Sequence, residues 1–124
     1  METNINEIQV NGIVYVVKGS EQGQPAVNSE GLPYVVIRAK YAGVFAGYLK
    51  SKKDNEVTLV DARRLWYWSG ASSCTQIAID GVAHPDACKF TQAIAEQTIA
   101  EWIEILPATE KARKCIQGVK AWKQ

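Results

Sequence analysis

Hydrophobic and polar residues alternate through much of the first half of the chain, with the period of two that is typical of half-buried strands. Asn11-Gly12 separates two apolar runs, and both residues tolerate the positive φ of a type I′ turn, so residues 8–18 are expected to form a hairpin. Further strands are predicted over residues 32–38, 40–50 and 56–68, with a polar loop over 19–33 and a hairpin loop over 51–55.

The second half of the chain carries helix start and stop signals. A serine or threonine can accept from the free amides of a helix's first turn, and a glycine is common just past the last turn. Two short helices are predicted in this way: 73–80 behind Ser72 or Ser73, with Ile77 and Ala78 facing the core and Gly81 at its end, and 110–117 between Thr109 and Gly118.

Residues 97–106 fit two structures. Ile99, Trp102, Ile103 and Leu106 recur at helical spacing, and the same stretch also fits an edge strand, with Pro107 ending either one. With that alternative open, the elements predict a single α+β domain over residues 1–124. We expect a mostly antiparallel β-sheet of about five or six strands with two or three short helices.

Composition limits the function classes. The formal net charge is +1, which disfavours a protein that coats DNA or an anionic membrane. No apolar run approaches the ~20 residues that cross a bilayer, and the start lacks the pattern of a signal peptide. The odd number of widely spaced cysteines, three, fits reduced thiols. A cytoplasmic protein, free of membrane and DNA, is therefore expected.

Signals for catalysis or metal binding are thin. The one histidine, His84, lies in a Pro-bearing loop, and Cys88 follows it without enough further ligands for a zinc site. The chain has no phosphate-binding glycine loop and no nucleophile-elbow motif. We expect no catalytic residue, no metal and no cofactor.

Candidate binding residues are most concentrated in residues 61–70, Asp-Ala-Arg-Arg-Leu-Trp-Tyr-Trp-Ser-Gly. This decapeptide holds half of the Trp residues and half of the Arg residues of the chain. Guanidinium groups fit phosphate oxygens, and aromatic rings stack on bases. In a strand, Arg64, Trp66 and Trp68 would share one face and predict a nucleotide pocket. Arg63 would then face the other way, toward a carboxylate such as Asp61. The alternative is that the aromatic residues are core and the arginines reach outward to solvent.

Other candidates lie on both sides of this stretch. Gly43 and Gly47 leave room for a bulge, or for close approach by a ligand or another backbone, in the strand that carries Tyr41 and Phe45. The helix predicted over 110–117 carries two candidate anion-binding cations near its positive end, although a solvated charged face is the alternative. The full set of ligand-binding candidates is Arg63, Arg64, Trp66, Trp68, Tyr41, Phe45, Phe90, Lys111 and Arg113.

Several of these motifs together resemble a small phage protein family, the first-described phage inhibitors of the Thoeris defence system. The resemblance covers roughly residues 34–122 and is most specific at Arg-Arg-Leu-Trp-Tyr-Trp. The matching segments are 43–50, 62–71, 81–82, 88–90 and 109–112. It implies a molecular sponge that binds cyclic ADP-ribose isomers made by TIR-domain enzymes without cleaving them. It also implies a homo-oligomer with ligand pockets between subunits, in some members with cyclic oligonucleotides at a separate site.

Three function classes therefore remain. The first is an anti-defence protein that sequesters a cyclic ADP-ribose-type nucleotide in the host cytosol. The second is a phage structural or interaction protein, such as a capsid decoration, that uses the aromatic and arginine residues as a protein interface. The third is a single-stranded nucleic-acid binder, which the near-neutral charge disfavours.

Overall fold

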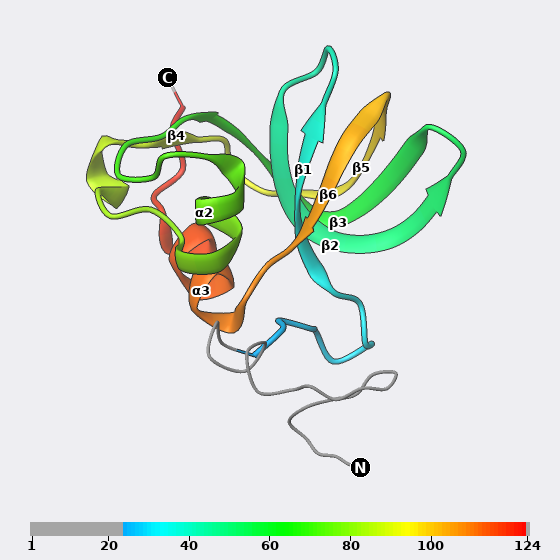
Figure 1. Cartoon of the computed structure of the whole chain (residues 1–124), viewed down its shortest axis with the longest axis horizontal. Coiled ribbons are helices and arrows are strands. Elements are labelled where there is room, and N and C mark those ends of the chain that lie inside the picture. Colours follow the sequence, from blue (N-terminus) through cyan, green and yellow to red (C-terminus); the bar gives the residue numbers. More distant parts are fainter. Residues whose placement is uncertain (1–23, 124) are drawn as a thin grey trace.

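A computed structural model describes residues 24–123 of the 124. Its architecture is α+β, as predicted: a six-stranded antiparallel sheet, two α-helices and one turn of 3₁₀ helix (Figure 1). The hairpin predicted over residues 8–18 lies outside the described residues. The elements are β1 (Tyr34–Ala39), β2 (Val44–Lys53), β3 (Glu56–Tyr67), α2 (Cys74–Asp80), η1 (Pro85–Ala87), β4 (Lys89–Phe90), β5 (Ile94–Ala100), β6 (Trp102–Pro107) and α3 (Glu110–Gly118).

The sheet is built around β3, the longest strand. Its strand order is β4-β3-β2-β1-β6, and β5 pairs with the first part of β3. The β2–β3 hairpin is tighter than the loop predicted over 51–55, because Ser51, Lys52 and Lys53 remain paired with β3. Only two residues turn the chain, and the first, Asp54, has a φ of 52°.

The stretch 97–106 is not a helix. Its two halves belong to β5 and β6, which pair with β3 and β1 respectively. Glu101 reverses the chain between them at a φ of 59°, its amide donating to the Asn55 carbonyl at 2.7 Å. Local spacing left both structures open, and pairing with two strands that are distant in sequence decides between them.

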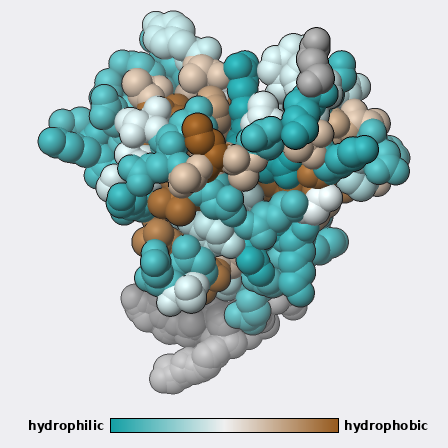
Figure 2. All heavy atoms as spheres, turned by 180° about the vertical axis from the view of Figure 1, so that it is seen from behind, coloured by the Kyte–Doolittle hydropathy of each residue, from teal (hydrophilic) through white to brown (hydrophobic). Residues whose placement is uncertain are grey.

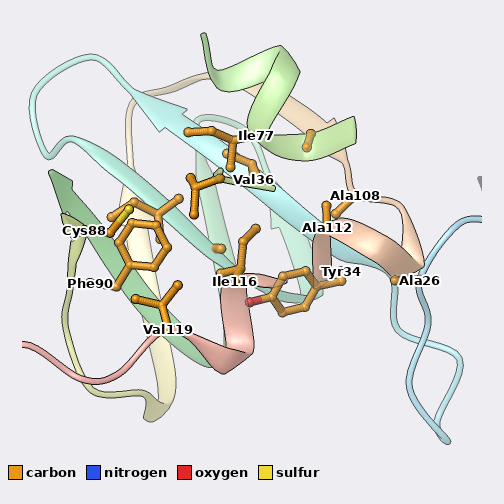
Figure 3. Packing of buried hydrophobic residues seen from close by; sticks show 14 of the residues in the cluster. Ala26, Tyr34, Val36, Ile77, Cys88, Phe90, Ala108, Ala112, Ile116 and Val119 are labelled. Atoms are coloured by element: carbon orange, nitrogen blue, oxygen red, sulfur yellow. The ribbon is translucent and has the colours of Figure 1, made fainter. Parts of the chain in front are cut away.

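Two hydrophobic cores flank the sheet. The first lies between the sheet and the two helices, where Tyr34 packs beside Ile116 of α3 (Figure 3). The second lies within the curve of the sheet and contains Val57, Leu59 and Phe45. Figure 1 shows both helices on one side of the strands. Within residues 24–123, helices therefore cover the sheet on one side only.

Both predicted helix starts are confirmed. The Ser73 hydroxyl accepts from the amide of Gln76, and the Thr109 hydroxyl accepts from the amide of Ala112. Thr109 also donates to the carbonyl of Ile79 at 2.7 Å. One threonine thus begins α3 and docks it onto the end of α2.

No helix among residues 24–123 is long and apolar enough to cross a membrane. The face seen from behind in Figure 2 is mostly hydrophilic, with hydrophobic residues in separate patches. The exposed large hydrophobic side chains of the described residues are Val27, Tyr41, Trp66, Tyr67, Ile94, Ile103 and Trp122.

Candidate functional site

A bulge at Asp61 sets the orientation of the side chains that follow it in β3. Between two neighbouring pairs, β3 advances three residues, from Val60 to Arg63, while β2 covers two. Asp61 takes the left-handed conformation, with a φ of 55°. The extra residue changes which face the odd-numbered residues occupy, so Arg64 pairs directly opposite Phe45 of β2.

Arg63 is buried, with 6 % of its surface exposed. Its Nε donates to the Thr91 carbonyl at 2.7 Å, and its Nη2 donates to the Phe90 carbonyl at 3.2 Å. Its Nη1 donates to the carbonyls of Ile116 and Val119, both at 2.9 Å. Arg63 therefore donates to these main-chain carbonyls and not to the Asp61 carboxylate predicted as its partner. Burial of the guanidinium lowers the pKa of Arg63.

The Arg63 guanidinium therefore caps the C-terminal end of α3. The last carbonyls of an α-helix have no intrahelical partner, and a cation there also meets the negative end of the helix dipole. The acceptors at Ile116 and Val119 lie at the end of α3, while those at Phe90 and Thr91 lie at the end of β4 and just after it. Arg63 holds these segments onto β3 and has a structural role.

Arg64 lies on the opposite face and lines a cavity of about 640 Å³. Its main chain exchanges two hydrogen bonds with Thr91: the Arg64 amide donates to the threonine hydroxyl at 2.9 Å, and the Thr91 amide donates to the Arg64 carbonyl at 3.0 Å. The cavity is lined by Tyr41, Ala42, Phe45, Arg64, Thr91, Gln92, Ala93, Ile94 and Gln97.

A missing side chain makes room for the Arg64 guanidinium. A Cβ placed on Gly43 would lie 3.0 Å from Nη2 and 3.1 Å from Nε of Arg64. Gly43 also has a φ of 111°, a conformation that residues with a Cβ rarely adopt. The backbone therefore favours glycine at this position, and a side chain here would displace the Arg64 guanidinium that lies against it.

The cavity has the charge of an anion site. Among the described residues, its lining contains one cation, two amide side chains, two hydroxyls and no carboxylate. Arg64 forms no ion pair with any residue in 24–123. Tyr41 is 77 % exposed and offers a ring face at the rim, while Phe45 is buried and forms part of the floor. An anionic ligand with a planar ring can use both features.

The remaining aromatic candidates lie elsewhere. Trp66 stacks on Trp122 with ring centroids 5.1 Å apart, and the Lys89 ammonium lies 5.5 Å from each ring. Phe90 is fully buried in the core between the sheet and the two helices. Trp68 follows the end of β3 and packs against that core, so it does not share a strand face with Arg64 as predicted. None of these three candidates lines the cavity.

The two candidate cations on α3, Lys111 and Arg113, also lie outside the cavity lining. Lys111 lies 3.5 Å from the carboxylate of Asp80. Arg113 is held by the carboxylate of Glu110 and by the hydroxyl of Tyr48 at 3.0 Å, and the hydrogen bond that Arg113 donates to Glu110 raises the pKa of Arg113. Both cations thus have partners on or near their own helix.

The cavity residues that were not predicted from the sequence lie in the link before β5 and in β5 itself. Thr91, Gln92, Ile94 and Gln97 supply much of the cavity wall. They carry no recognisable motif, and only the pairing of β5 with β3 brings them to Arg64. A strand prediction starting at Ile94 would have been the one available signal.

His84, the one histidine of the chain, lies beside a serine hydroxyl. His84 is exposed, and its Nδ1 lies 3.2 Å from the Ser69 hydroxyl. Within residues 24–123, no group of three or more His, Cys, Asp and Glu side chains is placed to hold a metal ion.

Residues 32–116 match the model of one family, described as a domain of unknown function, DUF6948. The chain belongs to this family. The match covers every strand of the sheet and most of α3, so the cavity and the buried Arg63 both lie within the family's domain. No curated protein and no solved structure matches the chain.

Proposed function

We propose that this protein binds a cyclic ADP-ribose-type nucleotide at the Arg64 cavity and sequesters it without cleaving it. The observation that carries the proposal is the cavity's lining: an arginine without an ion pair among the described residues, exposed and buried aromatic rings, and no carboxylate. The resemblance at Arg-Arg-Leu-Trp-Tyr-Trp to phage Thoeris inhibitors supplies the ligand class. In this role the protein is an anti-defence factor in the host cytosol, acting on signals from TIR-domain enzymes.

The chemistry of the ligand matches the cavity group by group. A pyrophosphate accepts from the guanidinium of Arg64, and an adenine stacks on the ring of Tyr41. The amides of Gln92 and Gln97 can donate to and accept from a base edge or ribose hydroxyls. The volume of about 640 Å³ lies within the ~300–1,000 Å³ typical of small-molecule sites.

Sequestration requires tight binding and no chemistry. A sponge has no need of an acid, a base or a metal, and it lowers a signal by holding it in excess of the receptor. Calorimetry with cyclic ADP-ribose isomers tests binding directly. After the complex is denatured, chromatography should return the ligand intact, whereas linear ADP-ribose would make the protein an enzyme.

Arg64→Ala is the decisive variant. Truncating an arginine that pairs with phosphate in a desolvated site costs about 2–4 kcal/mol, a loss of roughly thirty- to a thousand-fold in affinity. Lys111→Ala is the matched control, because it removes an exposed cation that lies outside the cavity. Equal affinities for the wild type and Arg64→Ala would exclude this cavity as the nucleotide site.

One feature favours a second role as a protein interface. Trp66 and Trp122 form a stacked pair that stays 51 % and 38 % exposed, beside the half-exposed Tyr67. Such residues are enriched at protein interfaces, so we expect self-association, as a dimer or higher oligomer. Sedimentation of the wild type and of Trp66→Ala at micromolar concentration tests this, and a monomeric wild type would contradict it.

A further inference from the structure

A second, smaller cavity lies on the other side of the segment that joins β4 to β5. Its volume is about 310 Å³, and it is lined by Tyr34, Asp61, Arg63, Ala93 and Gln117. Among the residues that the structure describes, it shares only Ala93 with the Arg64 cavity. The proposed nucleotide site therefore does not account for it.

Two polar groups of this cavity are buried and have hydrogen-bonding capacity to spare. Tyr34 is 1 % exposed, and its hydroxyl has no hydrogen-bond partner among the described residues. The Arg63 guanidinium has five N–H donors, of which four are used by main-chain carbonyls. Because an unpaired buried hydroxyl is costly, these groups indicate that something polar occupies the space beside them.

Asp61 and Gln117 supply the exposed part of the lining. The left-handed backbone of Asp61 belongs to the bulge in β3, and bulges often redirect a side chain near a binding site. The amide of Gln117 donates to the hydroxyl of Tyr48 at 3.2 Å. The lining thus combines a cation, a carboxylate, a phenol hydroxyl and an amide.

This combination selects against charged ligands. An anion attracted by Arg63 would be repelled by Asp61. A cation attracted by Asp61 would be repelled by Arg63. A hydroxyl group both donates and accepts, so one hydroxyl can donate to Asp61 while a second accepts from Tyr34 or Arg63. We propose that this cavity binds a small neutral polyol of the size of a pentose, independently of the nucleotide in the Arg64 cavity. The volume lies at the small end of the range for ligand sites, which fits a single sugar ring.

Titration of the full chain with D-ribose, followed by amide NMR, tests this assignment. We expect saturable shifts at Ala93 and Gln117 in the wild type. Tyr34→Phe removes only the hydroxyl and should weaken binding about three- to tenfold. Asp61→Asn removes a charged acceptor and should weaken it about ten- to a hundredfold.

Two controls keep the outcome interpretable. Arg64→Ala should leave ribose binding unchanged, since Arg64 does not line this cavity. A thermal melt of Tyr34→Phe should match or exceed that of the wild type, because the variant loses an unpaired hydroxyl and keeps the ring. The proposal is overturned if ribose gives no saturable shift, in which case the cavity holds water only, or if Tyr34→Phe and Asp61→Asn bind ribose as the wild type does.

Discussion

Replacing Arg63 with alanine should destabilise this protein more than any other arginine substitution in the described chain. Four hydrogen bonds from a charged group to carbonyls would be lost, each worth about 1.5–3 kcal/mol when removed alone. Part of that loss is offset, because a buried cation would no longer be held away from water. We therefore expect a net loss of about 3–5 kcal/mol in the free energy of unfolding.

A loss of this size is a large share of the total stability of a domain, about 5–15 kcal/mol. The assay is urea denaturation at fixed ionic strength, with both the midpoint and the slope measured. Arg64→Ala is the matched control on the next residue, with the same change in charge and an expected effect of about 0.5 kcal/mol or less. Arg63→Lys should recover little, since a single ammonium cannot reach four carbonyls in different directions.

Equal midpoints for Arg63→Ala and Arg64→Ala would refute this reasoning. They would mean that the ends of β4 and α3 are held by their apolar contacts alone, and that the four carbonyls find water when the guanidinium is gone. A lower slope without a lower midpoint would instead indicate that the tail after α3 had already separated from β3 in the native state.

Three further predictions follow from single positions. Gly43→Ala should weaken nucleotide binding about tenfold in calorimetry, because its Cβ would lie 3.0 Å from Arg64 Nη2 at a φ of 111°. Gly81→Ala should cost about 2–4 kcal/mol in urea denaturation, because its Cβ would lie 2.6 Å from that of Cys115 at a φ of 80°. Burial raises the pKa of Tyr34 above its ordinary value of 10.0, so the folded state resists the ionisation that the unfolded chain permits. Stability should therefore be intact below pH 10.0 and fall as pH rises above it, and Tyr34→Phe should lessen that fall in alkaline melts.

Elements with local signals were predictable from the sequence. The two N-caps needed only a hydroxyl side chain ahead of an apolar helical stretch, and both Ser73 and Thr109 serve as predicted. The long strand needed only alternation, and β3 ends one residue before the predicted boundary at 68. The helix–strand ambiguity over 97–106 had no local solution, because the hydrogen bonds that settle it come from β1 and β3.

The candidate site was predictable only in part, for the same reason. Arg64, Tyr41 and Phe45 do line one cavity, whereas Trp66 and Trp68 do not. Local alternation can say that two residues share a face, but it cannot say where a strand ends or what covers it. Trp66 is covered by Trp122, from the far end of the chain. The glutamines of the cavity come from the link and strand that pairing with β3 brings into place.

The bulge at Asp61 explains why two adjacent arginines have such different surroundings. In a regular strand, Arg63 would share a face with Val57 and Leu59, and its charge would lie in the apolar core within the curve of the sheet. The extra residue at Asp61 reverses the faces of the sheet on which Arg63 and Arg64 lie. Arg64 then lies at the open end of that face opposite Phe45, where its guanidinium lines a cavity. Arg63 and Leu65 turn to the helix side, where carbonyls at the end of α3 accept from the Arg63 guanidinium. A deletion of Asp61 should therefore disturb both roles at once, lowering stability through Arg63 and ligand binding through Arg64, whereas Asp61→Gly keeps the extra residue and should preserve both.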